Sequence, residues 1–359
     1  MRKISTFKLS KLQQNEYNKL NFVNDYPSIK IASYSQLVSE VAELSFLYDE
    51  NMLFFRGQNE NFTLKGENAN KSTFYPGIYR DRKNDKNNSL SQKVRILNQA
   101  SELLIHEVRK REINGVDEIV KKRYLQWSIL QHYEICETPL LDLTHSLRVA
   151  CSFALLNNNK NGYLYVFALP YVTNRISTNS EQETVIVRLL SICPPDALRP
   201  YYQDGYLVGT EFVVEEYNKK NELDFNRRLV GNYEIINNES FWDQDVAQIP
   251  GEILYPNRHD IFYELANDIK RKLLIQNGIN ENNTYEIGDF IVNFNKLQLI
   301  IRKLSRQKND VYRSKINNIN NFYKGMIKSN YSVTKNDLRN FTDQILAIIK
   351  GETYDSEKL

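Results

Sequence analysis

The stretch Phe54–Gln58, which reads FFRGQ, is the feature of this 359-residue sequence that most constrains its fold and its chemistry. The apolar run from Met52 to Phe55 predicts a short buried strand, and Arg56 would leave the core where that strand ends. Gly57 would allow a turn with positive φ or a close approach of a ligand to the main chain. A guanidinium at a rigid strand end is suited to a phosphate or carboxylate ligand. The alternative is an arginine paired with a carboxylate of its own fold.

Size and composition are those of a soluble globular protein with one large core, or one core and a smaller helical unit. The net charge of +3 is too small to imply a polyanion as the partner of the whole chain. No apolar run is long enough to span a membrane, so we expect no membrane partner. No apolar segment follows the basic start, which argues against a secretory signal.

The cysteines and histidines suggest neither disulfides nor a metal site. The three cysteines, Cys136, Cys151 and Cys193, do not pair off by count and show no CxxC spacing, which fits a reducing cytoplasm. The histidines are scattered, so we expect no metal. A nucleophilic pair of Cys151 with His132 or His145 is conceivable, but the apolar neighbours of Cys151 predict an inert core thiol.

Helix and strand patterns alternate along the chain without a strict strand–helix–strand order. Apolar spacing predicts helices at 34–48, with Ser35 as its cap, and at 91–112, 116–133, 147–156 and 261–276. Strand patterns occur at 52–55, 140–143, 163–169, 206–208, 233–236 and 252–255, and residues 184–190 fit a strand or a short helix. We therefore expect an α+β fold with a mixed or antiparallel sheet core and flanking helices.

The chain is expected to have three parts. Residues 1–30 form an irregular segment, 31–288 the α+β domain, and 289–359 an all-helical C-terminal extension. Basic residues dominate the stretch 301–328, which predicts a solvated helix face or, alternatively, a surface for nucleic acid or an acidic partner. No pattern in the sequence specifies an oligomeric state.

A second group of polar residues lies in the middle of the chain. Gln131–Tyr133 closes a helix, and the strand Leu140–Leu143 follows. Asp142, Thr144 and Ser146 alternate, so they share one strand face if the strand continues that far. They lie at a strand-to-helix junction, where free backbone N–H groups favour anions. The alternative is that Thr144 and Ser146 only cap the helix and Asp142 is a buried hydrogen-bonding acid.

Together these segments resemble the FRG domain family over about residues 34–300. The family pattern has a glycine at the position of Glu134, and the best counterpart of its late Gln-Gln-Gly-x-Phe strand, Leu229–Tyr233, lacks both glutamines. The resemblance is carried by Phe55–Gln58 with Leu64, Gln131–Tyr133, Leu140–Ser146, a small-residue helix with Ala150, Phe153 and Ala154, Gly162–Val166 and Gln276–Asn280.

The resemblance implies a layout like that of ADP-ribosyltransferases, with NAD as the substrate. Arg56 would hold the pyrophosphate or ribose, and Thr144 and Ser146 would hydrogen-bond the nicotinamide ribose. Tyr133 or Tyr165 would stack on the nicotinamide ring. The same resemblance implies an NAD glycohydrolase or a toxin-like effector in conflict between bacteria and phage.

Cleavage of the glycosidic bond of NAD would require a carboxylate near the ribose carbon to stabilise positive charge. Glu234 and Glu252 are the candidate catalytic residues, by their strand positions. The alternatives are a non-catalytic nucleotide-binding or nucleic-acid-binding module, and a protein-interaction module with residues 289–359 as a docking arm. The candidate ligand-binding residues are Arg56, Gly57, Gln58, His132, Tyr133, Asp142, Thr144 and Ser146.

Overall fold

The structure is a computed structural model, and the chain divides into two compact units, Met1–Ile269 and Lys270–Leu359. The residues that it describes are 1–17, 27–63, 71–80, 89–156, 161–210, 225–237, 240–243, 245–255 and 260–276. The predicted helical extension at 289–359, its basic stretch 301–328, and Leu64 and Gly278 of the family resemblance lie outside these residues.

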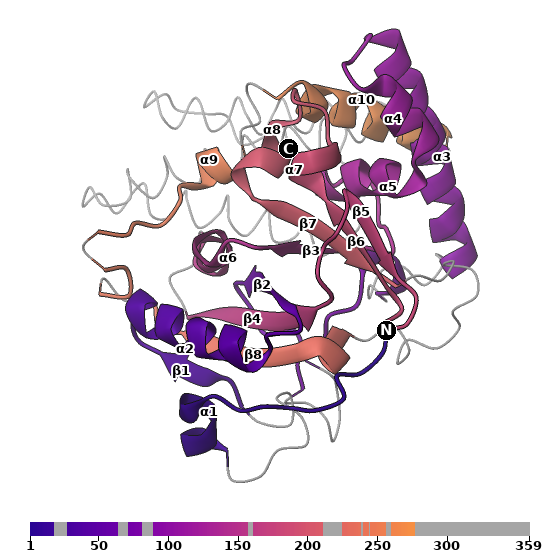
Figure 1. The fold of residues 1–359 in the computed structure, drawn as a ribbon. Coiled ribbons are helices and arrows are strands. Elements are labelled where there is room, and N and C mark those ends of the chain that lie inside the picture. Colours follow the sequence, from indigo (N-terminus) through magenta and orange to yellow (C-terminus); the bar gives the residue numbers. More distant parts are fainter. Residues whose placement is uncertain are drawn as a thin grey trace, which may run out of the picture. The chain divides into compact units, whose positions relative to one another are not determined.

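The first unit is built on one mixed sheet of eight strands in the order β1-β8-β4-β2-β3-β7-β6-β5 (Figure 1). Strand β1 runs parallel to β8, and the remaining neighbours are antiparallel. Helices flank the sheet, so the predicted α+β class with a mixed sheet is confirmed. The strands are β1 (Ile29–Ile31), β2 (Met52–Gln58), β3 (Leu141–Thr144), β4 (Gly162–Leu169), β5 (Ile176–Asn179), β6 (Thr184–Arg188), β7 (Gly205–Gly209) and β8 (Leu229–Ile235).

The helices follow the predicted pattern with a few differences. The sequence pattern at 184–190 fitted either a strand or a short helix. The structure has both, because strand β6 ends at Arg188 and helix α7 begins at Leu189. The described helices are α1 (Lys11–Glu16), α2 (Tyr34–Leu47), α3 (Leu90–Lys110), α4 (Val116–Lys121), α5 (Arg123–His132), α6 (Leu147–Ala154), α7 (Leu189–Ile192), α8 (Leu198–Tyr202), α9 (Gly251–Leu254) and α10 (Ile261–Gln276), with 3₁₀ turns η3 (Gly77–Tyr79) and η6 (Phe225–Arg228).

Two helix boundaries differ from those predicted. The single helix expected at 116–133 is broken at Lys122, whose backbone is extended (φ −115°, ψ 101°). Ser33, rather than Ser35, caps α2, because its side chain accepts a hydrogen bond from the backbone N–H of Gln36. The cap of α6 is Ser146, as predicted.

The strand predicted at 252–255 is wrong, because this segment is the short helix α9. Pro250 precedes it with φ −59°, which suits the start of a helix. The backbone N–H groups of Leu254 and Tyr255 then bond to the carbonyl oxygens of Pro250 and Gly251 at 3.1 and 2.8 Å. These bonds within the segment satisfy backbone N–H groups that, in a strand, would need the carbonyl oxygens of a neighbouring strand.

Helices α2 and α6 cover one face of the sheet, and Gly57 allows α6 to approach it. A Cβ atom built on Gly57 would lie 1.8 Å from the carbonyl oxygen of Ala150 and 2.9 Å from the backbone nitrogen of Ala154. Gly57 has no positive φ; among the glycines of the described chain only Gly115 does. The expectation that Gly57 serves a turn is therefore corrected, since helix packing on β2 requires the glycine here.

The sheet consists of two halves, and backbone pairing between them is limited to a single residue pair. Strands β2 and β3 share one residue pair, Phe55 with Thr144, whereas β2 pairs with β4 along its whole length and β3 pairs with β7. Beyond this pair the two strands part. The half with β1, β8, β4 and β2 and the half with β3, β7, β6 and β5 therefore leave a gap between them that side chains must fill.

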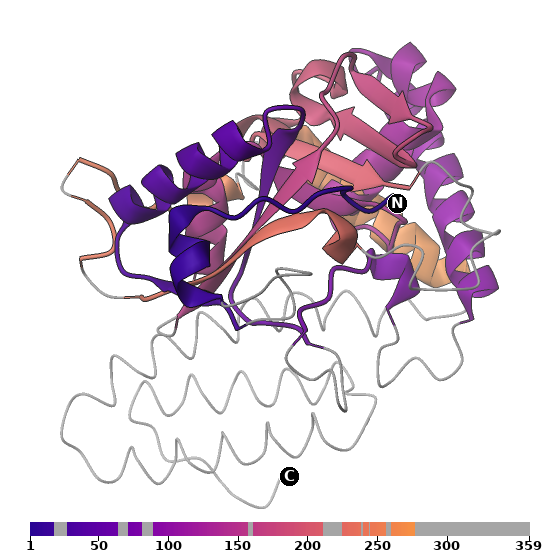
Figure 2. The ribbon, with the colours of Figure 1, turned by 60° about the horizontal axis from the view of Figure 1, so that its bottom comes forward.

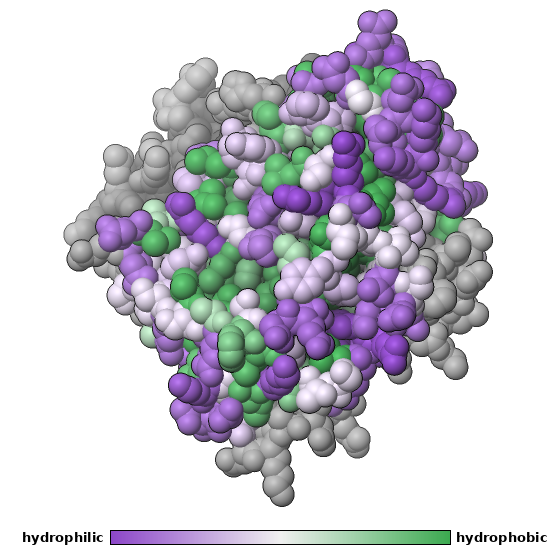
Figure 3. Space-filling model, in the orientation of Figure 1, coloured by the Kyte–Doolittle hydropathy of each residue, from purple (hydrophilic) through white to green (hydrophobic). Residues whose placement is uncertain are grey.

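Helices α3, α4 and α5 pack together at the end of the sheet opposite to α2 (Figures 1 and 2). The outer surfaces of α3 and α4 are mainly hydrophilic (Figure 3). This is expected of amphipathic surface helices, whose apolar stripe faces the core and whose polar side faces the solvent. None of the helices in the described part of the chain is long and apolar enough to cross a membrane.

Candidate ligand-binding site

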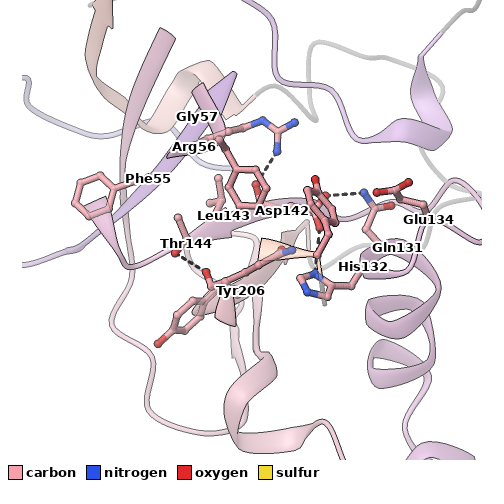
Figure 4. Close-up of a pocket in the computed structure, with 14 residues that line it drawn as sticks. Phe55, Arg56, Gly57, Gln131, His132, Glu134, Asp142, Leu143, Thr144 and Tyr206 are labelled. Carbon is pink, nitrogen blue, oxygen red and sulfur yellow. Dashed lines mark hydrogen bonds and ion pairs between the residues drawn. The ribbon is translucent and has the colours of Figure 1, made fainter. Parts of the chain in front are cut away.

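A cavity of about 260 Å³ lies where strands β2 and β3 part (Figure 4). Its walls combine charged, polar and aromatic side chains from both halves of the sheet, from the end of α5 and from the segment after α9. The lining residues are Phe55, Arg56, Gly57, Gln131, His132, Glu134, Asp142, Leu143, Thr144, Phe153, Gln203, Gly205, Tyr206 and Tyr255.

Arg56 reaches from β2 across the gap toward β3. Its Nη1 donates to the main-chain carbonyl oxygen of Asp142 at 2.7 Å, and its buried Nε has no hydrogen-bond partner. Burial lowers the pKa of Arg56 to about 10, against the opposing effect of the Asp142 charge, so the side chain remains a cation at neutral pH. Among the described residues no carboxylate forms an ion pair with Arg56, and the guanidinium bonds to a main-chain oxygen instead.

Asp142 presents its carboxylate to the same cavity. Its side chain is 42% exposed although it lies in the middle of the sheet. Gln131 donates from Nε2 to Oδ2 at 2.8 Å. Burial alone would raise the pKa of Asp142, but the neighbouring His132 ring, the charge of Arg56 and the hydrogen bond from Gln131 hold it below its usual value. Asp142 is therefore an anion at neutral pH.

His132 lies beside Asp142 at the end of α5. Its Nδ1 is 3.8 Å from Oδ1 of Asp142, and the side chain is 4% exposed. Its buried Nε2 has no hydrogen-bond partner. The main-chain carbonyl oxygen of His132 accepts from Arg199 at 3.1 Å, which fixes the end of the helix. The cavity thus holds a cation, an anion and an imidazole in contact range of one ligand.

The two predicted hydroxyl residues have different positions. Thr144 lines the cavity, but its hydroxyl donates to the carbonyl oxygen of Gln203 at 2.9 Å and accepts from the backbone N–H of Ser146 at 3.0 Å. Ser146 caps α6 and does not line the cavity. The pair of hydroxyls therefore holds the strand-to-helix junction, and only Thr144 borders the cavity.

Three other predicted ligand contacts lie away from the cavity. Tyr133 is 1% exposed, and its hydroxyl donates to Asp260 at 2.7 Å. Tyr165 is fully buried and packs on Phe74. Gln58 is 8% exposed and does not line the cavity. Neither tyrosine ring faces the cavity, so the predicted stacking on a nicotinamide ring has no support in this geometry.

The two predicted catalytic glutamates also lie outside the cavity. Glu234 lies near the end of β8, where Asn161 donates to its carboxylate at 2.7 Å. Glu252 is exposed on α9. Its prediction depended on the strand pattern at 252–255, which folds as a helix instead.

The sequence reasoning missed Glu134 as a cavity residue. Glu134 follows the end of α5 with φ 54°, a left-handed conformation that favours glycine. The family pattern has a glycine at this position, so the departure at Glu134 was the signal. Its side chain is 68% exposed and lies 3.7 Å from Arg199.

Residues far along the chain complete the cavity, and no sequence pattern marked them. Gln203 donates from its side chain to the carbonyl oxygen of Leu254 at 2.7 Å. Tyr206 comes from β7 and Tyr255 follows α9. Burial raises the pKa of both tyrosines, so both are neutral donors at physiological pH.

The remaining sequence expectations concern metals and thiols. No group of residues in the described ranges could hold a metal ion. The three cysteines are free, and Cys151 is fully buried. Burial raises the pKa of Cys151, as it does for a thiol in an apolar core.

The fold and the cavity define an α+β protein whose sheet is divided in two, with a polar site in the division. The family model for the FRG domain matches residues 51–162. The chain therefore contains an FRG domain, which runs from the start of β2 to the first residue of β4. Ten of the fourteen cavity residues lie within this match, and the other four are Gln203, Gly205, Tyr206 and Tyr255. Comparison with curated proteins and comparison with solved structures each found no match.

Proposed function

We propose that the cavity binds the ribose-phosphate part of NAD and that the protein is an ADP-ribosyltransferase or an NAD glycohydrolase. The observation that carries this proposal is that Arg56, with no ion pair to a described carboxylate, and the anionic Asp142 line the same cavity. A guanidinium fork matches phosphate oxygens, and a carboxylate accepts hydrogen bonds from ribose hydroxyls. A ligand that satisfies both groups has an anion close to a hydroxylated sugar.

The volume of the cavity is large enough for one end of such a ligand. Its volume of about 260 Å³ is slightly below the usual range for ligand pockets, roughly 300–1,000 Å³. It would therefore enclose a ribose with one phosphate, and the rest of NAD would extend through the mouth of the cavity.

The order of elements also supports the proposal. An arginine on the early strand β2 and a threonine on β3, which leads into α6, resemble the layout of ADP-ribosyltransferases. This is an analogy at the level of the fold, and the family match by itself assigns no reaction. An enzyme that consumes NAD would suit an effector in conflict between bacteria and phage.

A nucleotide-binding module without catalysis is the second candidate. It is favoured by the positions of Glu234 and Glu252, neither of which lines the cavity. Both candidates require nucleotide binding through Arg56. They differ in whether nicotinamide is released.

Melting temperatures with and without NAD test the shared claim. A ligand at a hundred times its Kd stabilises a protein by about 2.7 kcal/mol, which corresponds to a rise of several degrees. We expect this rise for the wild type and not for Arg56→Ala. The matched control Arg95→Ala removes an exposed arginine of α3 and should keep the rise. If saturating NAD leaves the wild-type melting temperature unmoved, the proposal is wrong, and chromatography of nicotinamide separates the two candidates.

A further inference from the structure

Two carboxylates line the cavity, and they differ in how they are held. Glu134 is 68% exposed, and its nearest cation is Arg199 at 3.7 Å. Asp142 comes from β3, and among the described residues its carboxylate has Gln131 and His132 as partners (Figure 4). A carboxylate that meets a reacting atom must be held in one place, which favours Asp142.

A chain of hydrogen bonds fixes the Asp142 carboxylate. The Thr138 hydroxyl donates to Oε1 of Gln131 at 2.9 Å, so the amide nitrogen of Gln131 must point the other way. That nitrogen donates to Oδ2 of Asp142 at 2.8 Å. Gln131 and Asp142 belong to the sequence blocks that resemble the family, and together with Thr138 they orient one carboxylate.

The titratable groups that line the cavity together with Asp142 come from several elements. His132 and Glu134 come from the end of α5, Arg56 from β2, Tyr206 from β7, and Tyr255 from the segment after α9. Of these groups His132 and Arg56 favour the ionised carboxylate, and so does the hydrogen bond from Gln131. Gln131 donates to Oδ2, and Nδ1 of His132 lies 3.8 Å from Oδ1, whereas a carboxylate can accept about four hydrogen bonds. No other described residue donates to this carboxylate, so a ligand can occupy the remaining acceptor positions.

We infer that Asp142 is the catalytic carboxylate of this cavity, and that Gln131 and His132 are its positioning residues. This inference rests on the proposed function. The bond between the nicotinamide nitrogen and ribose C1′ breaks, and its electron pair leaves with nicotinamide, which departs uncharged. The Asp142 carboxylate stabilises the positive charge that forms on the ribose. The oxygen of water or of an acceptor hydroxyl then bonds to C1′ and gives its proton to Asp142, which passes it to solvent.

The variant Asp142→Asn tests this assignment in the full chain. Arg56 bonds to the main-chain oxygen of residue 142, so the substitution leaves the anchor of Arg56 in place. We expect nicotinamide release to fall by about 100-fold or more, since this is the usual contribution of such a group. The rise in melting temperature with NAD should persist, because Arg56 still meets the phosphate and the amide oxygen of Asp142→Asn still accepts from a ribose hydroxyl. Asp117→Asn, on the exposed side of α4, is the matched control and should keep full turnover.

Several outcomes would overturn the assignment. Turnover by Asp142→Asn within about threefold of the wild type would do so, and nucleotide binding would still stand. Loss of turnover in Glu234→Gln with Asp142→Asn unaffected would move the role to Glu234. A wild type that binds NAD without releasing nicotinamide has no catalytic residue, and one that does not bind NAD refutes the proposed function itself.

Gln131→Met provides a second readout if Asp142→Asn does not fold. Loss of the hydrogen bond from Gln131 should raise the pKa of Asp142 in the protein. The acid limb of the profile of kcat against pH should therefore move to higher pH. A residue with a merely structural role would lower kcat at all pH values, and an unmoved acid limb would contradict the positioning role of Gln131 and the assignment of Asp142.

Discussion

The guanidinium of Arg56 donates to the main-chain carbonyl oxygen of Asp142 across 2.7 Å, and this bond bridges the two halves of the sheet. In a continuous sheet, backbone hydrogen bonds would go on joining β2 and β3 beyond the pair of Phe55 and Thr144. The arginine replaces one of them, and its side chain also lines the cavity. The same separation of strands thus creates the cavity and supplies its cation.

Gly57→Ala should destabilise the protein strongly. The added Cβ would meet the backbone of α6 at 1.8 Å, and backbone cannot rotate away as a side chain can. We expect the free energy of unfolding to fall by at least about 3 kcal/mol, at the upper end of the range for overpacking. Urea unfolding measures it, with Gly77→Ala as the control, because a Cβ there meets its nearest atom at an ordinary 3.5 Å. Equal stability of Gly57→Ala and Gly77→Ala would refute the close approach of α6.

Glu134→Gly should stabilise the fold. A residue with a Cβ in the left-handed region costs about 1 kcal/mol, and glycine removes this cost. Glu112→Gly is the matched control, since Glu112 has φ 52° and lies after α3, outside the cavity. Both variants should melt at higher temperature, but only Glu134→Gly should change the affinity for NAD in a calorimetric titration. A stabilised Glu134→Gly with unchanged affinity would show that this carboxylate has no part in binding.

Tyr133→Phe should lower stability without affecting the response to NAD. The lost hydroxyl donates to Asp260, which is 2% exposed, so a buried acceptor would lose a partner at a cost of about 1–3 kcal/mol. The control Tyr201→Phe changes a 67% exposed side chain and should be neutral. Chemical unfolding and the NAD-dependent shift in melting temperature check the two parts. An unchanged stability together with a lost NAD response would instead return Tyr133 to the ligand site.

The acid dependence of stability should report the state of Asp142. Its pKa is lower in the folded protein than in the unfolded chain, where it is near 3.8. The ionised carboxylate therefore contributes stability that is fully present above the unfolded pKa and is lost as the pH falls through the folded pKa. Urea midpoints of the wild type and Asp142→Asn should converge below about pH 4. Midpoints that diverge further in acid would reverse the sign of the inferred pKa shift.

Local patterns predicted most of the elements that hold the site. The apolar run before Arg56 gave strand β2, and the alternation around Asp142 gave β3 with Ser146 as the cap of α6. Propensity and hydrophobic period act over a few residues, so such features can be found in a single sequence.

The contacts that decide the roles of these residues are long-range. The reason for Gly57 lies in the backbone of Ala150, and Tyr133 turns toward Asp260 rather than the cavity. Glu252 was placed on a strand because its apolar neighbours fit one, while Pro250 starts a helix there. The periodicity of apolar residues in a sequence cannot show which distant segment each side chain will contact.

A crystal structure with ADP-ribose tests the central claim most directly. The account predicts a phosphate oxygen within about 3 Å of the Arg56 guanidinium and a ribose hydroxyl on the carboxylate of Asp142. ADP-ribose bound elsewhere on the protein, with Arg56 and Asp142 free of contact to it, would contradict the account.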